Sequence, residues 1–393
     1  MNILFICNEY PPYPQGGIGT FNQIIAKGLH ARGHLVIVAG YYDNMSSPLS
    51  VNQDHGILIY RLRQCKGHYG IFRTRLKLYL MVKKIIKRHS IDVLEVPDFL
   101  GLLAFWPRLS IPIVVRLHGS ATYFSVEMNQ QIIRKYFLYE WLTLKKAANL
   151  VSVSKYTAIK TKLIFKIESP IEIIYNTLKV EDIGCSSGLM RDAYKVLFTG
   201  TLMKKKGVFS LIEAWPEVLK MFPKARLHLF GKDSYNENGI SIISILQQDL
   251  SASFRETTIF HGHVPRQQIL NELKIASVAV FPSFSEAFAL APLEAMAQGC
   301  PTIYTKRASG PEVIDDGVNG LLVDPGNPDE IAKAIIKILT DNSFAAKIGD
   351  EGKKSVAHRF SESVILEQNE RMYENLLASY ANRRNTFSFR RPT

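Results

Sequence analysis

The chain has 393 residues, and at roughly 100 to 200 residues per domain this length predicts two domains. Hydrophobic residues make up 47% and charged residues 21%, a composition that excludes wholesale disorder. The net charge is +13, and the whole excess lies in residues 1–180, because basic and acidic residues balance in 181–393.

The first part of the chain alternates short apolar segments with stretches of helical periodicity. Strands are predicted at residues 2–7, 35–39, 92–96, 112–117 and 149–153, and a helix at 19–32. Such alternation is typical of parallel strands joined by crossover helices. Residues 178–192 show no periodicity, and their small and charged residues predict an interdomain linker.

A second series of the same kind follows the linker. Its predicted strands are residues 195–199, 226–230, 257–260, 278–281, 301–304 and 320–323, with helices at 209–221 and 329–340. The predicted fold class is α/β, with two Rossmann-like, doubly wound parallel sheets. Because such sheets bind ligands beyond the carboxyl ends of their strands, two units facing each other would place a site in the cleft between them.

These patterns define the expected domain organisation. Residues 1–180 are predicted to form an N-terminal Rossmann-like domain, and residues 193–360 a C-terminal one. Residues 361–382 are predicted to form a helix that returns to the N-terminal domain. The basic segment 383–393 is expected to be a disordered tail.

The turn after the fourth strand of the second series carries the clearest candidate site. Pro292 favours a helix start and Gly299 a helix end, so a helix is predicted to begin at about Leu290. The free N–H groups of such a start favour a diphosphate, and Glu294 could accept hydrogen bonds from ribose hydroxyls. Glu286, in the preceding loop, could reach other polar groups of a ligand. Two carboxylates at this spacing could equally cap and solvate a helix.

This segment, SEAFALAPLEAMAQGCP, resembles the E-x7-E signature of retaining GT-B glycosyltransferases, in particular glycosyltransferase family 4 of bacterial cell-surface glycan synthesis. The resemblance implies a GT-B fold, in which residues 1–180 form the acceptor-side domain and residues 193–360 the domain that binds the nucleotide-sugar donor. It also implies that Glu286 contacts hydroxyls of the donor sugar and that Glu294 binds the ribose. Backbone amides of Phe288, Ala289 and Leu290 would hold the diphosphate, with Ala289 in place of the usual glycine.

The segment FTGTLMKKKG, after the first strand of the second series, is another match. Lysines at a strand-to-helix turn suit a diphosphate, although such a run is more often simply solvated. The segment resembles the family's G-R-L-x-x-x-K-G motif, which implies that Lys206 grips the donor phosphates. Thr201 stands where the motif has arginine, and a hydroxyl cannot provide a bidentate guanidinium contact. Lys204 or Lys205 could compensate.

A glycine-rich turn, NEYPPYPQGGIGTF, follows the first predicted strand. Gly16, Gly17 and Gly19 would let the backbone approach a ligand closely. The spacing is not the G-x-G-x-x-G of nicotinamide-binding proteins, and the turn alone could be merely structural. It resembles the family's P-P-x-x-G-G loop, which implies that Gly16 and Gly17 contact the donor phosphates from the opposite domain.

Two further candidates lie at predicted strand ends of the N-terminal domain. His118 follows an apolar strand and precedes Gly119, and the family has H-G or H-D at this point. A lone histidine is usually structural, but the resemblance implies that His118 contacts the donor sugar. Asp98 follows the strand at 92–96 and is a candidate for the acceptor side.

Shorter matches extend the resemblance over most of the chain. They are VSVSKYT, IIYNTL, HGHVP and SGPEVIDDGVNGLLVDPGNPDEIA. Val264, which lies in HGHVP, is thereby a candidate donor-binding residue.

The resemblance implies transfer of a sugar from a nucleoside diphosphate sugar, with UDP slightly favoured over GDP, to a polysaccharide or lipid-linked oligosaccharide. Retention would come from front-face attack, in which the departing diphosphate helps to deprotonate the acceptor. No covalent nucleophile is therefore expected, and His118 and Glu286 are the predicted catalytic residues. No D-x-D motif occurs, and a helix start with Lys206 can replace a divalent ion, so neither a metal nor a cofactor is expected.

Two alternative functions remain open. The first is transfer to a small soluble acceptor, as in sucrose-type synthesis or the tailoring of natural products. The second is a non-catalytic, nucleotide-binding partner of an active transferase, and the loss of arginine at Thr201 is the feature that favours it.

Residues 71–90, IFRTRLKLYLMVKKIIKRHS, contain seven basic residues and no acidic one, interleaved with apolar residues. A helix of this composition could lie on an anionic membrane surface, and it could equally pack on the first sheet with a solvated basic face. Nothing in the chain resembles a nucleic-acid-binding module, so no nucleic acid partner is expected.

The expected location is the cytoplasm. Four cysteines without a C-x-x-C pair are typical of reduced thiols. The N-terminus lacks the pattern of a secretion signal, and no apolar run reaches about 18 residues. If residues 71–90 bind lipid, the protein would lie peripherally on the inner face of the cell membrane.

Overall fold

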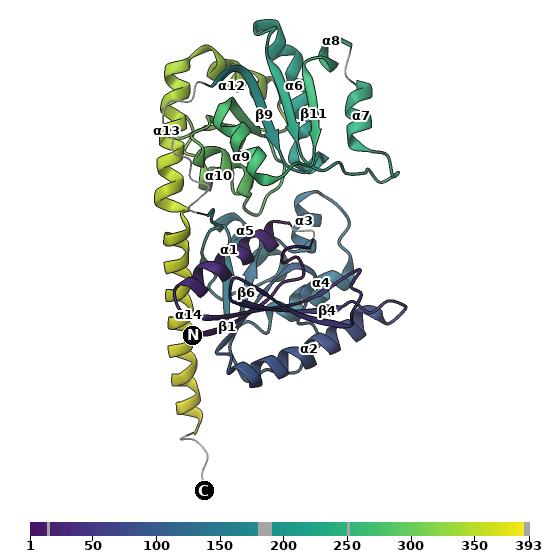
Figure 1. Ribbon diagram of the computed structural model, residues 1–393, viewed down its shortest axis with the longest axis vertical. Coiled ribbons are helices and arrows are strands. Elements are labelled where there is room, and N and C mark those ends of the chain that lie inside the picture. Colours follow the sequence, from purple (N-terminus) through teal and green to yellow (C-terminus); the bar gives the residue numbers. More distant parts are fainter. Residues whose placement is uncertain (14–15, 180–190, 250–251, 389–393) are drawn as a thin grey trace. The chain divides into compact units, whose positions relative to one another are not determined.

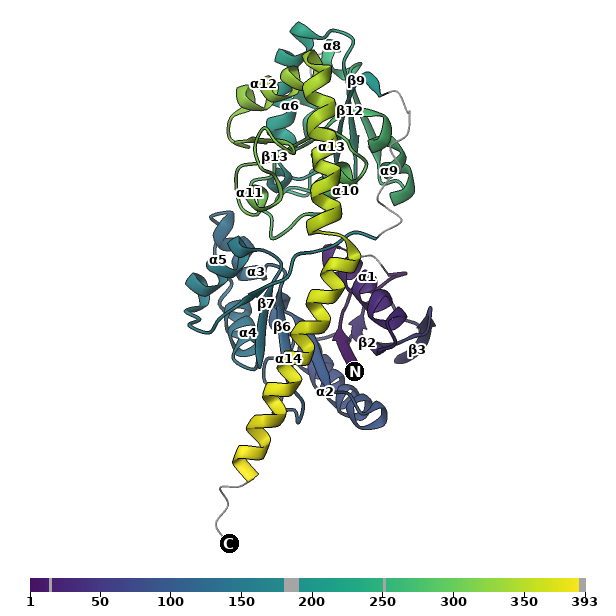
Figure 2. The same cartoon turned by 90° about the vertical axis from the view of Figure 1, so that its left-hand side faces the viewer.

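The computed structural model describes residues 1–13, 16–179, 191–249 and 252–388. Contacts within the chain divide it into two compact units (Figure 1 and Figure 2). Unit 1 comprises Met1–Thr177 together with the chain from Glu362 onward, and unit 2 comprises Leu178–Ser361. Most of the predicted linker falls on 180–190, which lie outside the described residues.

Unit 1 is built around a sheet with the strand order β3-β4-β2-β1-β5-β6-β7-β8 in its described residues. Neighbouring strands are parallel except β3 and β4, which pair antiparallel. The strands are β1 (Asn2–Ile6), β2 (Leu35–Tyr42), β3 (Leu49–Asp54), β4 (Ile57–Arg63), β5 (Val93–Pro97), β6 (Ile113–Leu117), β7 (Asn149–Ser152) and β8 (Glu172–Ile173). The carboxyl ends of β1, β5 and β6 therefore meet at one edge of the sheet.

Helices cover both faces of this sheet. Side chains alternate along a strand, so Ile3 and Phe5 pack in one layer while Leu4 and Ile6 pack in the other. The first layer includes α1 (Gly17–Ala31) and α14 (Glu362–Ser388), and the second includes α2 (Gly70–His89), α4 (Arg134–Leu144) and α5 (Lys155–Phe165). The 3-10 turn η1 (Phe99–Gly101) follows β5, and α3 (Ala121–Glu127) follows β6.

The C-terminal helix α14 contributes to the core of unit 1 through a buried polar network. Arg116 of β6 is fully buried and pairs with both carboxylate oxygens of Glu95 on β5, at 2.6 and 3.0 Å. Its Nη2 also donates to Asn369 Oδ1 of α14 at 2.5 Å. Tyr373 Oη of α14 donates to Glu95 Oε2 at 2.6 Å. Charges lose their contacts with water when they are buried, and further hydrogen bonds must compensate for this loss. Asn369 and Tyr373 of α14 supply two of these hydrogen bonds.

Unit 2 contains a parallel sheet with the strand order β11-β10-β9-β12-β13-β14 in its described residues. The strands are β9 (Asp192–Thr199), β10 (Arg226–Phe230), β11 (Thr258–Gly262), β12 (Ala276–Phe281), β13 (Thr302–Thr305) and β14 (Leu321–Val323). Helices α6 (Val208–Met221) and α12 (Pro328–Thr340) pack together over a core that includes Trp215 and Ile335. Helices α9 (Arg266–Ile275) and α10 (Leu290–Ala297) lie outside this core, where they contact each other and β12.

The described residues of unit 2 form further α-helices. They are α7 (Ile242–Asp249), α8 (Ala252–Arg255), α11 (Gly310–Val313) and α13 (Asn342–Arg359), and α13 packs on α10.

The structure confirms the predicted α/β class with two doubly wound, mainly parallel sheets. The antiparallel pair β3 and β4 was not predicted. Most residues of β3 are exposed, including Leu49 and Val51, so this edge strand lacks the buried alternation by which strands are recognised. The structure also differs from the disordered tail expected at 383–393, because α14 continues to Ser388. Extending a formed helix costs far less than nucleating one, and residues 389–393 lie outside the described residues.

Tyr373→Phe removes the hydroxyl that bonds Glu95 and keeps the aromatic ring. We expect the free energy of unfolding in urea to fall by about 1.5–3 kcal/mol, the usual contribution of a hydrogen bond to a charged group. Tyr380→Phe is the matched control, because the Tyr380 hydroxyl lies in an exposed position 3.4 Å from the Ser110 carbonyl. Equal effects of the two variants would contradict a stabilising role for the α14 network.

Candidate functional site

Helix α10 begins near the carboxyl end of β12 without a side-chain cap. Its N-cap residue, Ala289, has extended backbone angles and provides no side-chain hydrogen bond to the helix start, and no acidic residue lies in the first turn. Pro292 is the third helical residue, where its missing N–H has no intrahelical partner to lose. Gly299 ends the helix with a φ of 66°. The start of α10 therefore offers backbone N–H groups to an anion.

Glu286 lies in the loop before α10 and is almost fully buried. Its Oε1 is 2.5 Å from Lys206 Nζ. Burial alone raises the pKa of Glu286, but the charges of Lys206 and Lys205 outweigh burial and hold the pKa below its ordinary value. The carboxylate is therefore ionised at physiological pH and forms an ion pair with Lys206.

The turn that carries Lys206 is fixed against the Glu286 loop. Residues Lys204–Lys206 form the 3-10 turn η3, and Gly207 follows with a φ of 73°. Phe284 N–H donates to the Lys205 carbonyl at 2.8 Å. A Cβ on Gly207 would lie 1.7 Å from the Pro282 carbonyl oxygen, so a larger residue could not fit without moving the loop. This close contact places the lysines beside Glu286.

Glu294, on α10, pairs with Arg266. Arg266 Nε lies 2.7 Å from Glu294 Oε1, and Arg266 is the first residue of α9, two positions after Val264. The pair therefore joins the Val264 loop to α10. Arg266 was not predicted from the sequence. A basic residue at a helix N-terminus opposes the helix dipole, and that unfavourable position was the available signal.

His118 and Asp98 meet at the carboxyl ends of β6 and β5. His118 N–H donates to Asp98 Oδ1 at 2.9 Å, and the His118 ring packs edge-on against Phe21 of α1, 5.1 Å between centroids. Burial, with the nearby charge of Arg116, lowers the pKa of His118 to about 3, so the ring is neutral at physiological pH.

Asp98 has a different environment from the one that an acceptor contact requires. Its side chain is fully buried, and burial raises its pKa to about 8, although N–H groups of His118 and Gly119 act in the opposite direction. The carboxyl group is engaged with the backbone at the end of β6. In this structure Asp98 therefore orients the turn after His118 and does not reach an accessible surface.

The glycine-rich turn leads into α1, and its residues 14–15 lie outside the described part of the chain. Gly16 is the N-cap of α1, and its N–H donates to Glu9 Oε2 at 2.6 Å. A Cβ on Gly17 would meet no described atom within 4 Å. The Glu9 carboxylate thus accepts the hydrogen bond from Gly16 N–H that an anionic ligand at this helix start would accept.

Unit 1 has a large hollow beyond the carboxyl ends of β1, β2 and β5, with a volume of about 910 Å³. Aromatic side chains form much of its wall, and charged and amide groups lie among them. The residues that carry this character are Tyr13, Tyr41, Tyr42, Phe99, Tyr136 and Tyr139, with Asn8, Glu9, Asp43, Arg75 and Lys135. Apolar walls with a few polar groups are typical of small-molecule sites, and they suit a sugar, which has apolar ring faces and hydroxyl edges.

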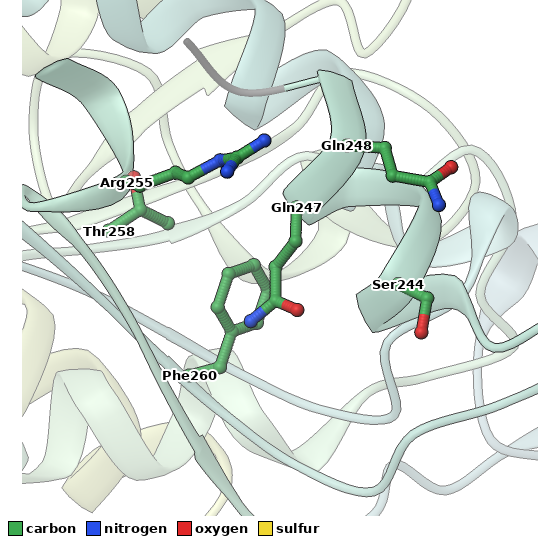
Figure 3. Close-up of a pocket in the computed structure, with 6 residues that line it drawn as sticks. All are labelled: Ser244, Gln247, Gln248, Arg255, Thr258 and Phe260. Carbon is green, nitrogen blue, oxygen red and sulfur yellow. The ribbon is translucent and has the colours of Figure 1, made fainter. Parts of the chain in front are cut away.

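Figure 3 shows a smaller hollow in unit 2, with a volume of about 370 Å³. Ser244, Gln247 and Gln248 come from α7, Arg255 comes from α8, and Thr258 and Phe260 come from β11. Thr258 is the first residue of β11, whereas Val264 follows its last residue. None of the predicted site residues lines this hollow.

In residues 1–13, 16–179, 191–249 and 252–388, no group of three or more His, Cys, Asp or Glu side chains is arranged to hold a metal ion. Over the same ranges, no helix has both the length and the apolar character needed to cross a membrane.

The predicted site residues thus divide between the two units. In unit 2, the structure brings Lys206 beside Glu286 and places both near the start of α10, which carries Glu294. In unit 1, His118 and Asp98 are in direct contact, and His118 packs on α1, the helix that Gly16 caps.

Comparison with known families identifies the class of protein. Residues 15–182 match Glycosyltransferase Family 4, and residues 185–355 match Glycosyl transferases group 1. The chain belongs to the GT-B glycosyltransferases of the family 4 type. Each family region falls almost entirely within one half of the chain, and the two matches leave only short segments uncovered.

Individual relatives agree with this assignment along nearly the whole chain. An uncharacterized glycosyltransferase of Methanocaldococcus jannaschii is 27% identical over 95% of this chain and 98% of its own. The fold resembles that of sucrose-phosphate synthase from Thermosynechococcus elongatus, with 20% identity, a TM-score of 0.79 and coverage of 96% and 99%. It also resembles HepE of Anabaena, solved in complex with UDP, with 19% identity, a TM-score of 0.74 and coverage of 95% and 100%.

Gly207→Ala tests the close contact between η3 and the Glu286 loop. Gly239→Ala is the matched control, because Gly239 has a φ of 74° and open space where a methyl group would be added, whereas a Cβ on Gly207 collides with Pro282. Left-handed backbone strain of about 1–2 kcal/mol applies to both variants. We expect Gly207→Ala to lower the free energy of unfolding in urea by clearly more than Gly239→Ala. Equal losses would show that the contact does not constrain the turn.

Proposed function

We propose that this glycosyltransferase moves a sugar, with retention of anomeric configuration and without a metal ion, from a nucleoside diphosphate sugar to a polysaccharide or lipid-linked oligosaccharide. The observation that carries the proposal is the ion pair of the buried Glu286 with the half-buried Lys206, close to the start of α10, whose N-cap residue provides no side-chain hydrogen bond. An ionised acid, a cation and the N–H groups of a helix start together match a ligand that has both sugar hydroxyls and phosphates.

Each part of the donor has a partner in this arrangement. The diphosphate would accept hydrogen bonds from the amides of Phe288, Ala289 and Leu290 and from Lys206. Glu294 would accept hydrogen bonds from the ribose hydroxyls, with Val264 near the base. A UDP-sugar is the favoured donor, and the binding of UDP and UDP-glucose by HepE of Anabaena supports this choice.

The ion pairs of the structure would be exchanged when the donor binds. Glu286 would release part of its contact with Lys206 and accept hydrogen bonds from hydroxyls of the donor sugar. Glu294 would similarly exchange Arg266 for the ribose. Both carboxylates are already desolvated and oriented by their cations, so the site is organised before the ligand arrives.

The transfer itself needs no covalent intermediate with the protein. The acceptor hydroxyl oxygen attacks the anomeric carbon on the face from which the diphosphate leaves, and the acceptor proton passes to the leaving phosphate. Lys206 and the amides at the start of α10 stabilise the negative charge that grows on the diphosphate. His118, which is neutral, would contribute a hydrogen bond to the donor sugar. Gly16 and Gly17 would contact the phosphates once the Gly16 amide exchanges the Glu9 carboxylate for the ligand.

The acceptor is proposed to bind in the aromatic hollow of unit 1. Its rings can pack on apolar sugar faces, and its charged and amide groups can bond hydroxyls. Its volume of about 910 Å³ has room for the terminal sugar units of a glycan. Asp98 is proposed to act on the acceptor side only indirectly, by orienting the backbone after β6.

Glu286→Gln tests the role of the central carboxylate. With UDP-glucose as donor and hydrolysis as the reaction, we expect kcat/KM to fall by about 10- to 100-fold, because a charged hydrogen bond to the donor sugar becomes a neutral one. Glu237→Gln, on an exposed loop of unit 2, is the control and should leave turnover unchanged. The reaction should proceed in EDTA, and NMR of the first-formed sugar should show the anomer of the donor.

Three results would contradict the proposal in different ways. Turnover unaffected by Glu286→Gln would remove Glu286 from the site. An inverted product would exclude the retaining mechanism. Nucleotide binding by the wild-type protein, without turnover of any nucleotide sugar, would favour the non-catalytic partner subunit.

Association with an anionic membrane surface is the second part of the proposal, and α2 supports it. The buried side of this helix includes Leu78 and Val82. On its exposed side, Phe72, Leu76 and Leu80 follow at intervals of four residues and are 58%, 50% and 49% exposed. Basic residues are interspersed with this stripe, and the chain has no acidic residue between Asp54 and Asp92. An exposed apolar stripe on a helix whose own charged residues are all basic is complementary to anionic lipid.

The exposed stripe of α2 can be tested with the triple variant Phe72→Ser, Leu76→Ser and Leu80→Ser. Wild-type protein should co-sediment at low salt with vesicles of phosphatidylglycerol and phosphatidylcholine, and the triple variant should lose most of this binding. Met221→Ser with Val318→Ser, two exposed apolar positions in unit 2, is the control. Absence of wild-type binding to anionic vesicles, or equal binding by the triple variant, would refute this part of the proposal.

A further inference from the structure

The turn that is proposed to bind the donor phosphates lacks one cation that the family motif has. The family motif that η3 resembles has an arginine where this chain has Thr201. A guanidinium can hold two phosphate oxygens at once, whereas a hydroxyl carries no charge. A donor diphosphate at the start of α10 would therefore meet Lys206 as its one motif cation, unless another residue replaces the arginine.

The structure distinguishes the two neighbouring lysines. Lys204 is exposed, while Lys205 is half-buried in the same 3-10 turn. The backbone of Lys205 is tied to the Glu286 loop through the hydrogen bond from Phe284 N–H, at 2.8 Å. Gly207, two residues after Lys205, lies in close contact with the Pro282 carbonyl. The backbone of Lys205 is thus held directly by the loop that leads to α10, and its side chain is less exposed than that of Lys204.

Two lysines act on the Glu286 carboxylate. The charges of Lys206 and Lys205 hold the pKa of Glu286 below its ordinary value in spite of burial. Burial lowers the pKa of Lys205, and the proximity of Lys206 acts in the same direction, while Glu286 opposes both. The charge of Lys205 therefore lies close enough to act on Glu286, in the loop that leads to the N-terminus of α10, and a helix N-terminus favours an anion.

We propose that Lys205 is a phosphate-binding residue for the donor and replaces the arginine that is absent at Thr201. This assignment rests on the proposed function and extends it. Lys205 supplies a point charge and single hydrogen bonds in place of a bidentate guanidinium, and Lys206 remains bonded to Glu286 and to the same diphosphate. The desolvated setting of Lys205 strengthens its attraction to a phosphate oxygen relative to an exposed lysine.

Lys205→Met tests this assignment by calorimetric titration of the full chain with UDP and, separately, with uridine. We expect Lys205→Met to weaken UDP binding by about tenfold or more, because a charge-assisted hydrogen bond is lost. Uridine has no phosphate, so its binding should be unchanged. Lys204→Met is the matched control, and it should bind both compounds as the wild-type protein does.

A second arm restores the missing arginine. Thr201→Arg in the Lys205→Met background should recover most of the lost UDP affinity, because the arginine returns to its place in the motif. Lys205→Arg, which keeps the charge, should bind UDP within about threefold of wild type. If Lys205→Met does not fold, Lys205→Gln replaces it as the variant that lacks the charge, and Lys205→Arg remains the variant that keeps it.

The outcomes separate this assignment from the proposed function. If wild-type protein binds neither UDP nor GDP, the proposed function fails, and the assignment fails with it. If wild-type protein binds UDP and Lys205→Met binds it equally well, only the assignment fails. It also fails if Lys204→Met weakens UDP binding as strongly as Lys205→Met, or if both variants weaken uridine binding to the same extent as UDP binding.

Discussion

The attraction between the Glu286 carboxylate and two lysines organises the loops at the start of α10. Burial by itself would raise the pKa of Glu286, and the charges of Lys206 and Lys205 hold this pKa below its ordinary value. The backbone makes this cluster possible, because Gly207 lets η3 approach the Pro282 carbonyl more closely than any other residue would. Local chain geometry thus creates the electrostatic feature on which the proposed phosphate site depends.

The two units use the same structural principle with different chemistry. In each, polar residues follow the carboxyl ends of parallel strands, where neighbouring loops converge. In unit 2 these residues form ion pairs next to a helix start. In unit 1 the buried Asp98 orients the backbone of His118, and aromatic side chains enclose a hollow. Ion pairs at a helix start and an aromatic hollow are therefore found in separate parts of the chain, which fits the proposed transfer from a charged donor to a glycan.

Much of the fold and the core of the candidate site could be predicted from the sequence. Buried parallel strands are continuous apolar runs, and the position of Glu286 relative to Pro292 and Gly299 follows from local helix signals. Features that depend on tertiary contacts could not be predicted in this way. The pairing of Arg266 with Glu294 requires two loops to meet, and the burial of Asp98 depends on its contact with β6. The exposed apolar stripe on α2 could not be predicted either, because composition alone cannot show which apolar residues of a helix face the core.

The path of α14 has a consequence for how the protein is made. Unit 2 is formed by one continuous stretch of chain, whereas unit 1 receives Asn369 and Tyr373 from the far end of the sequence. During synthesis on the ribosome, unit 2 can therefore acquire all of its residues before the Glu95 and Arg116 pair obtains its last partners. The first domain to emerge would be the last to mature, and premature termination near the C-terminus would damage the N-terminal half of the protein.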